Sequence, residues 1–235
     1  MLWYKAWLET RSRFLVSLVG MVALPSYWVF HEDGLGTRLD WYYRTLHNGH
    51  GLLSAMWVLA VILLMMGGLL REKAAGTSSF TLALPVSRAH LMRVRILFGL
   101  AQAMTLIIIP WGVMFLVAAA TGNANSVSQA FFYVILLAGG GVVFFAVALL
   151  VSSVVEGEYT APAVCFGILF LDIVAFENGP LTSYSPWTFL VGTEYFDRAS
   201  QQLAGPVPWV HFSANVLAAI LLIAISIRAI QRTEF

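Results

Sequence analysis

Asp172 is the residue of this 235-residue chain whose type and position point most directly to chemistry. It lies inside an apolar run, where a carboxylate is costly to bury and is expected to face a protein interior, a cavity or a neighbouring helix. In such a place Asp172 could contact a substrate or take up a proton. It could equally lie near the outer end of the run, where water would reach it. Both interpretations stay open at this point.

His211 and Asn215 begin the last apolar run and share one helix face, because they are four residues apart. An intramembrane protease of the CAAX type would combine them with Glu-Glu-x-x-x-Arg and Phe-x-x-x-His motifs. Neither motif is in the sequence: Gly157 separates Glu156 from Glu158, and no histidine has a phenylalanine four residues before it. His211 is therefore interpreted as a hydrogen-bonded structural residue, and no catalytic residue is predicted.

The other polar candidates do not indicate a metal or redox site. His31, His47 and His50 have no carboxylates at a suitable spacing, so they are interpreted as polar residues of an exposed loop. Cys165 is the one cysteine, which excludes an intrachain disulfide. It is expected to be a small buried residue. We therefore predict no metal site and no cofactor in this chain.

The elements around these residues are those of a membrane protein. Hydrophobic residues make up 60% of the chain and charged residues 11%, with a mean hydropathy of +0.82. A soluble domain carries about 25% charged residues, so this composition predicts an all-α integral membrane protein that contacts the lipid bilayer and no nucleic acid. One domain is expected over residues 1–235. Its six predicted transmembrane helices are residues 14–30, 52–70, 96–120, 130–155, 160–176 and 209–227.

The first 13 residues are predicted to form an amphipathic helix at the membrane interface. On a helical wheel Trp3, Tyr4 and Trp7 share one face, and Lys5 and Glu9 share the opposite face. Aromatic rings favour the depth of the lipid headgroups. The alternative is a frayed terminus whose positive charges only set the orientation.

The distribution of basic residues predicts the orientation, because cytoplasmic loops carry an excess of Lys and Arg. Six spans place both termini on one side of the membrane. With the termini inside, three basic residues lie outside: Arg38, Arg44 and Arg198. Ten lie inside: Lys5, Arg11, Arg13, Arg71, Lys73, Arg88, Arg93, Arg95, Arg228 and Arg232. Both termini are therefore predicted to be cytoplasmic.

Residues 71–95 form the longest polar break in the first half of the chain. Hydroxyl side chains at 77–79 can cap a short helix, and Pro85 would end it. Ser87 can cap the next helix, which continues through Arg88 into the third predicted span. The segment is therefore predicted to be helix, break, helix along the inner membrane face.

This segment carries a set of motifs in a fixed order. They are an acidic and a basic residue at the end of the second span, Gly-Thr, a short helix with apolar positions, Leu-Pro-Val-Ser-Arg and a basic start to the third span. Here they read Arg71-Glu72, Gly76-Thr77, residues 80–84, Leu84-Pro85-Val86-Ser87-Arg88 and Arg93-Val94-Arg95. The pattern resembles the type-2 (ABC-2) permeases of ATP-binding-cassette (ABC) transporters. Ser152-Ser153 and Ser185-Pro186 add to a likeness that covers essentially the whole chain.

The resemblance implies that residues 74–84 form a cytoplasmic coupling helix, which docks on a separate ATP-hydrolysing subunit. The chain has no Gly-Lys dipeptide, so the phosphate loop is absent, and ATP and Mg would be bound by the partner. Family members commonly carry an acidic residue soon after Gly-Thr, whereas this chain has residues Ser78, Ser79 and Phe80 there. The residues expected at the ATPase contact are Glu72, Gly76, Thr77, Ser78, Phe80, Leu82, Leu84, Pro85, Ser87 and Arg88.

On this resemblance the chain is expected to be the permease subunit of an ATP-driven exporter in a prokaryotic inner membrane. A second permease chain, identical or related, and two ATPase subunits would complete the complex. Asp172 and the triplet Gly139, Gly140 and Gly141, which would let helices approach closely, are candidates for the substrate or dimer path. The alternative function is a permease-like anchor or signalling subunit that transports nothing.

The segment 177–208 is long for a connection and rich in aromatic residues. The resemblance implies a short helix pair that dips back into the outer leaflet. Interfacial aromatic residues are compatible with that arrangement. A loop that lies on the membrane surface is the alternative.

Overall fold

The computed structural model describes residues 2–31, 49–65, 87–120, 127–155, 157, 159–176, 182–197 and 202–232. Almost all of these residues are helical, which confirms the all-α prediction. The helices are α1 (Leu2–His31), α3 (Gly49–Met65), α6 (Arg88–Ala120), α7 (Val127–Val154), α8 (Thr160–Phe176), α9 (Pro186–Val191) and α10 (Trp209–Arg232). The smaller elements are the 3-10 turns η2 (Thr182–Tyr184) and η3 (Thr193–Tyr195) and the antiparallel strands β1 (Phe196–Asp197) and β2 (Gln202–Leu203).

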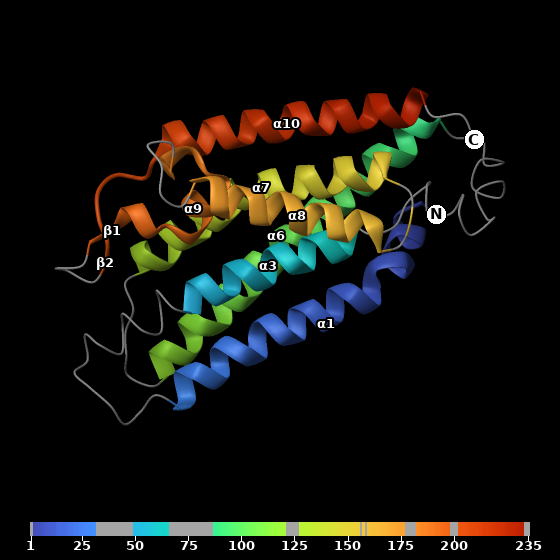
Figure 1. Cartoon of the computed structure of the whole chain (residues 1–235). Coiled ribbons are helices and arrows are strands. Elements are labelled where there is room, and N and C mark those ends of the chain that lie inside the picture. Colours follow the sequence, from blue (N-terminus) through green and yellow to red (C-terminus); the bar gives the residue numbers. More distant parts are fainter. Residues whose placement is uncertain are drawn as a thin grey trace.

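The long helices run back and forth in one bundle, with α7 among the others (Figure 1). α7 packs against α3, α6, α8, α9 and α10 and has most of its side chains buried. α1 packs against α3 and α6. The first turns of α1 and α6 and the last turns of α3 and α10 lie at the same end of the bundle (Figure 1). α9 and the two strands lie at the opposite end.

Three helices of the described chain are long and apolar enough to cross a membrane. They are Ala89–Val117 within α6, Val127–Val154 and Trp209–Gln231 within α10. His50–Met65 and Thr160–Phe176 are shorter apolar helices. Where the structure describes them, the six predicted spans fall on helices, but length and composition support membrane crossing for three of them. Crossing by the remaining helices stays a prediction.

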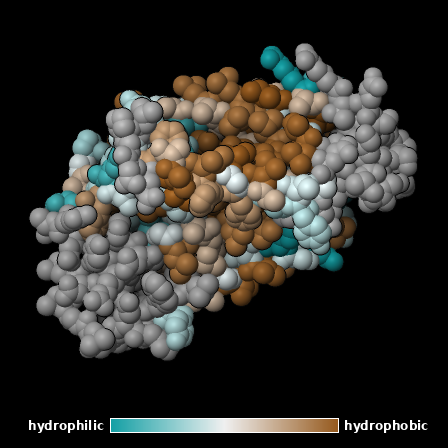
Figure 2. Space-filling view, in the orientation of Figure 1, coloured by the Kyte–Doolittle hydropathy of each residue, from teal (hydrophilic) through white to brown (hydrophobic). Residues whose placement is uncertain are grey.

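Large apolar side chains cover the outward faces of α8 and α10. Phe170 and Leu171 on α8 and Leu217 and Leu221 on α10 are all exposed. Apolar residues dominate the middle of the face shown in Figure 2. A continuous apolar surface is unfavourable in water, whereas lipid tails are as apolar as the side chains themselves. The bundle therefore has the surface of a membrane protein.

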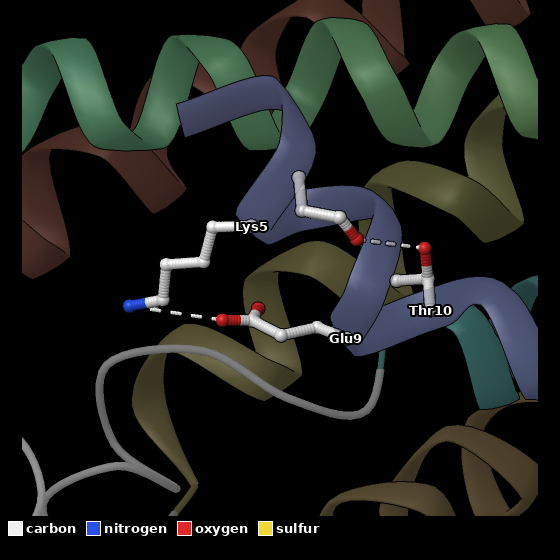
Figure 3. Close-up of polar contacts among 4 residues, drawn as sticks. Lys5, Glu9 and Thr10 are labelled. Atoms are coloured by element: carbon white, nitrogen blue, oxygen red, sulfur yellow. Dashed lines mark hydrogen bonds and ion pairs between the residues drawn. The ribbon is translucent and has the colours of Figure 1, made fainter. Parts of the chain in front are cut away.

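The N-terminal segment is continuous with the first long helix, and its place at the membrane interface stays a prediction. α1 is helical from Leu2 to His31 without interruption, although its first turns are bent relative to the rest (Figure 1). Trp7 packs edge-on against Phe98 of α6, with ring centroids 6.4 Å apart. Lys5 and Glu9 form a partly exposed ion pair on the same turns, with Lys5 Nζ 3.7 Å from Glu9 Oε1 (Figure 3). Trp3 and Trp7 of the predicted aromatic face thus contact α6, whereas Tyr4 is exposed.

Helix α6 begins where the sequence predicts. The backbone N–H of His90 donates to Ser87 Oγ at 3.2 Å, so Ser87 caps the helix and satisfies one of its first amides. α6 then includes Pro110 without ending there. In a membrane bundle, neighbouring helices can compensate for the backbone donor that proline lacks.

The glycine triplet of α7 allows three other helices to approach it. Cβ atoms on these residues would collide with Phe212 and Phe189 at Gly139, with α9 at Gly140, and with the Trp57 ring at Gly141. At Gly140 the collision includes backbone: a Cβ would lie 2.7 Å from Pro186 O and 2.9 Å from Leu190 Cα. The triplet therefore sets how closely α9, α10 and α3 pack on α7.

Replacing Gly140 by alanine should push α9 away from α7. Overpacking of this kind costs about 1–3 kcal/mol, so we expect a lower thermal midpoint for the detergent-solubilised protein. Gly112→Ala and Gly167→Ala are matched controls, since a Cβ at either position meets no atom within 4 Å. Both controls should be neutral or slightly stabilising. Equal midpoints for Gly140→Ala and the controls would show that the close approach is not required.

Candidate functional site

Most of the predicted ATPase contact lies outside the described residues. Glu72, Gly76, Thr77, Ser78, Phe80, Leu82, Leu84 and Pro85 belong to this part of the chain. Ser87 and Arg88 are described, at the start of α6. The part of the chain that holds these residues lies between Met65, the last described residue of α3, and Ser87. The last turn of α3 and the first turn of α6 lie at the same end of the bundle as the start of α1 and the last turn of α10 (Figure 1).

Asp172 binds the first turn of α9. Its Oδ2 atom accepts from Ser185 Oγ at 3.0 Å and from the backbone N–H of Trp187 at 3.3 Å. Ser185 Oγ in turn accepts from the N–H of Thr188 at 3.2 Å. A carboxylate at a helix N-terminus is favourable, because the first amides of the helix have no acceptor within it. Asp172 thus ties α8 to α9.

The two ends of α9 follow from its sequence. Pro186 occupies the first helical position, where a missing N–H costs nothing. Gly192 ends the helix with φ 74°, in the left-handed region, and its N–H donates to Thr188 O at 2.9 Å. Phe189 and Leu190 are buried between these ends. In the described part, segment 177–208 therefore holds one short α-helix between two 3-10 turns, and it differs from the predicted helix pair.

His50 lies in the core and not in an exposed loop, which corrects the interpretation from sequence. It belongs to the first turn of α3 and is fully buried. Its Nε2 atom lies 2.8 Å from Leu190 O, so Nε2 carries the proton and donates to α9. The ring centroid lies 4.5 Å from that of Tyr133, which stacks on Trp111 at 5.2 Å. This cluster joins α3, α6, α7 and α9.

A third polar contact fixes the strand pair at the same end. Gln129, in the first turn of α7, donates from Nε2 to Leu203 O and accepts at Oε1 from Leu203 N–H, both at 2.9 Å. The side-chain amide therefore acts as a β-bridge partner for β2. Nearby, burial and then the charge of Glu194 raise the pKa of Tyr195 above its ordinary value, so its phenol stays neutral.

The structure places α9 between the candidate path residues. Asp172 binds its first turn, and Gly140 lies against Pro186 and Leu190. Cys165 is buried and free, as predicted. His211 lies near the rings of Tyr184 and Phe189. Within the described ranges, no three His, Cys, Asp or Glu side chains form a group that could hold a metal ion.

A family model described as ABC-2 family transporter protein matches residues 15–182, which is well over half of the chain. The matched region contains most of α1, all of α3, α6, α7 and α8, and the segment between α3 and α6. No curated protein matches the chain.

Loss of the His50 hydrogen bond should destabilise the α9 end of the bundle. In a His50→Phe variant the ring contacts remain possible, but Leu190 O loses a buried donor, at a cost of about 1–3 kcal/mol. We expect a lower thermal midpoint in detergent. His90→Phe is the control, because His90 is exposed. An unchanged midpoint for His50→Phe would contradict the role of this bond.

Removing the carboxylate of Asp172 should loosen α9. Helix-capping interactions contribute about 1 kcal/mol, so amide exchange in residues 186–192 should be about fivefold faster in Asp172→Ala. The control is Glu194→Ala, which removes an exposed acceptor of Ser183 Oγ at 3.1 Å. Mass-spectrometric hydrogen exchange measures both. The account of Asp172 fails if α9 exchanges equally in the wild type and in Asp172→Ala.

Proposed function

The chain belongs to the ABC-2 transporter family, and on that premise we propose that it is the membrane-spanning half of an ATP-driven exporter. It is a multi-pass membrane protein and a permease subunit of an ABC transporter. The observation that carries the proposal is the family match over residues 15–182, which runs through the helices of the bundle and the segment between α3 and α6. The alternative of a non-transporting anchor has no specific observation in its favour.

ATP hydrolysis is assigned to a separate subunit. The chain has no Gly-Lys dipeptide, and the phosphate loop that binds ATP and Mg needs one. The proposed contact is the segment 72–88, with a coupling helix at 74–84. It follows α3 and precedes α6, so a partner bound there would act directly on two helices of the bundle. Two ATPase subunits and a second permease chain, identical or related, would complete the assembly.

The proposed orientation has both termini in the cytoplasm of a prokaryotic cell. The first turns of α1 and α6 and the last turns of α10 lie at one end of the bundle (Figure 1). Those turns carry Lys5, Arg11, Arg93, Arg228 and Arg232. Gathering of basic residues at one end supports a cytoplasmic position for that end.

The proposed cargo is apolar or amphipathic, such as a lipid, a drug-like molecule or a peptide. Among the described residues, the buried polar side chains are uncharged or histidine. A strongly charged cargo would need charged partners in the bundle. Asp172, Gly139, Gly140 and Gly141 remain the candidates for a substrate or dimer path. Unchanged transport in Asp172→Asn would remove Asp172 from that set.

Charges placed on the proposed coupling helix should abolish docking of the ATPase. Phe80→Asp combined with Leu82→Asp replaces two apolar contacts by carboxylates, and burying an unpaired charge costs several kcal/mol. The ATPase subunit should then no longer co-purify with the permease. Ser78→Asp combined with Ser79→Asp is the control, because it adds the same charge where family members commonly carry an acidic residue. Normal co-purification with the Phe80/Leu82 variant would refute the proposed contact.

A further inference from the structure

Two arginines from different helices bind the end of α3. Arg13 of α1 donates from Nη1 to Leu63 O at 3.1 Å, and Arg95 of α6 donates from Nη2 to Met65 O at 2.6 Å. Both contacts are partly buried. Each arginine therefore ties its own helix to the backbone of α3. We call these two arginines and their carbonyl acceptors the arginine clamp.

The two helices that carry the clamp are also bonded to each other. Gln102 of α6 donates from Nε2 to Thr10 Oγ1 at 2.9 Å. Thr10 Oγ1 in turn donates to Ala6 O at 2.9 Å, so its hydroxyl both donates and accepts (Figure 3). Thr10 and Arg13 are three residues apart and share one face of α1. That face therefore binds α6 through Thr10 and α3 through Arg13.

The position of the clamp matters because the proposed ATPase-binding segment, residues 72–88, begins seven residues after Met65. The same segment ends at Arg88, the first residue of α6, and Arg95 lies about two turns farther along that helix. A displacement of the segment that is passed back along the chain to α3 would move the carbonyls of Leu63 and Met65. Through the clamp, that movement would reach α1 and α6 together.

We propose that Arg13 and Arg95 are positioning residues that transmit movement of the ATPase-bound segment to α1 and α6. This inference rests on the proposed function, because it requires an ATPase subunit at residues 72–88. The arginines do not touch the ATPase or the cargo in this mechanism. They hold the end of α3 against both neighbours, so that the three helices move as one body.

Neighbouring arginines provide a matched comparison. Arg11 and Arg93 lie two residues before Arg13 and Arg95 on the same helices, and both are exposed. Replacing either pair by glutamine removes the same charge from the same end of the bundle. A contribution to membrane orientation would therefore be lost equally from both pairs. Only the loss of Arg13 and Arg95 would open the clamp.

The test uses the complete complex of permease and ATPase subunits, reconstituted in lipid nanodiscs. Hydrogen exchange of residues 2–13 is measured without nucleotide and with ATP, Mg and vanadate. In the wild type and in Arg11→Gln/Arg93→Gln, nucleotide should change this exchange. In Arg13→Gln/Arg95→Gln the change should fall by at least about fivefold, the lower end of ordinary coupling between sites, while the ATPase still co-purifies. Arg13→Lys/Arg95→Lys should restore part of the response, because lysine keeps the charge and a donor.

The outcomes separate the inference from the proposed function. Failure of the ATPase to bind the wild-type chain would refute the proposed function itself. Loss of binding only in Arg13→Gln/Arg95→Gln would contradict the inference, since the arginines would then serve docking. A nucleotide response at residues 2–13 equal to that of the control pair would also overturn it.

Discussion

Close packing on α7 is the constraint on which the rest of the bundle depends. Lipid tails are as apolar as the side chains, so the hydrophobic effect gives helices in a membrane little reason to associate, and close van der Waals contact must do so instead. Three consecutive glycines supply that contact. Phe212 lies against Gly139, Leu190 against Gly140 and Trp57 against Gly141. One helix thereby orders α10, α9 and α3 around itself.

Polar side chains add a second layer of order by binding the backbone of other helices. His50 lies at Leu190 O, Trp57 Nε1 donates to Ala103 O at 3.0 Å, and Gln129 bonds both backbone groups of Leu203. A polar group buried without a partner is costly, so each of these bonds also selects one register between two elements. At the opposite end of the bundle, Arg13 and Arg95 likewise bind the backbone of another helix, α3. In the proposed mechanism of ATP-driven movement, these bonds determine which helices move together.

The apolar runs of the sequence predicted the helices well. Residues 160–176 coincide with α8, and Ser87 caps α6 as its hydroxyl and position suggested. Local chemistry decides such features, so a single sequence is enough to find them. The burial of His50 depends instead on a carbonyl 140 residues away along the chain. Its partner, Leu190, lies in α9, which is too short for its hydrophobic pattern to predict a helix. Asp172 likewise finds its donors in another element, so its position in an apolar run could not identify them.

The central claim is that an ATPase subunit binds this permease at the segment between α3 and α6. Site-specific photo-crosslinking in the native membrane tests it most directly. A benzophenone amino acid would replace Phe80 in one variant and Phe131 in another. Phe131 is an exposed aromatic residue near the start of α7, at the opposite end of the bundle (Figure 1). The account predicts a crosslink to the ATPase subunit from position 80 and none from position 131. A crosslink from position 131 alone, or from neither position in an assembled complex, would contradict it.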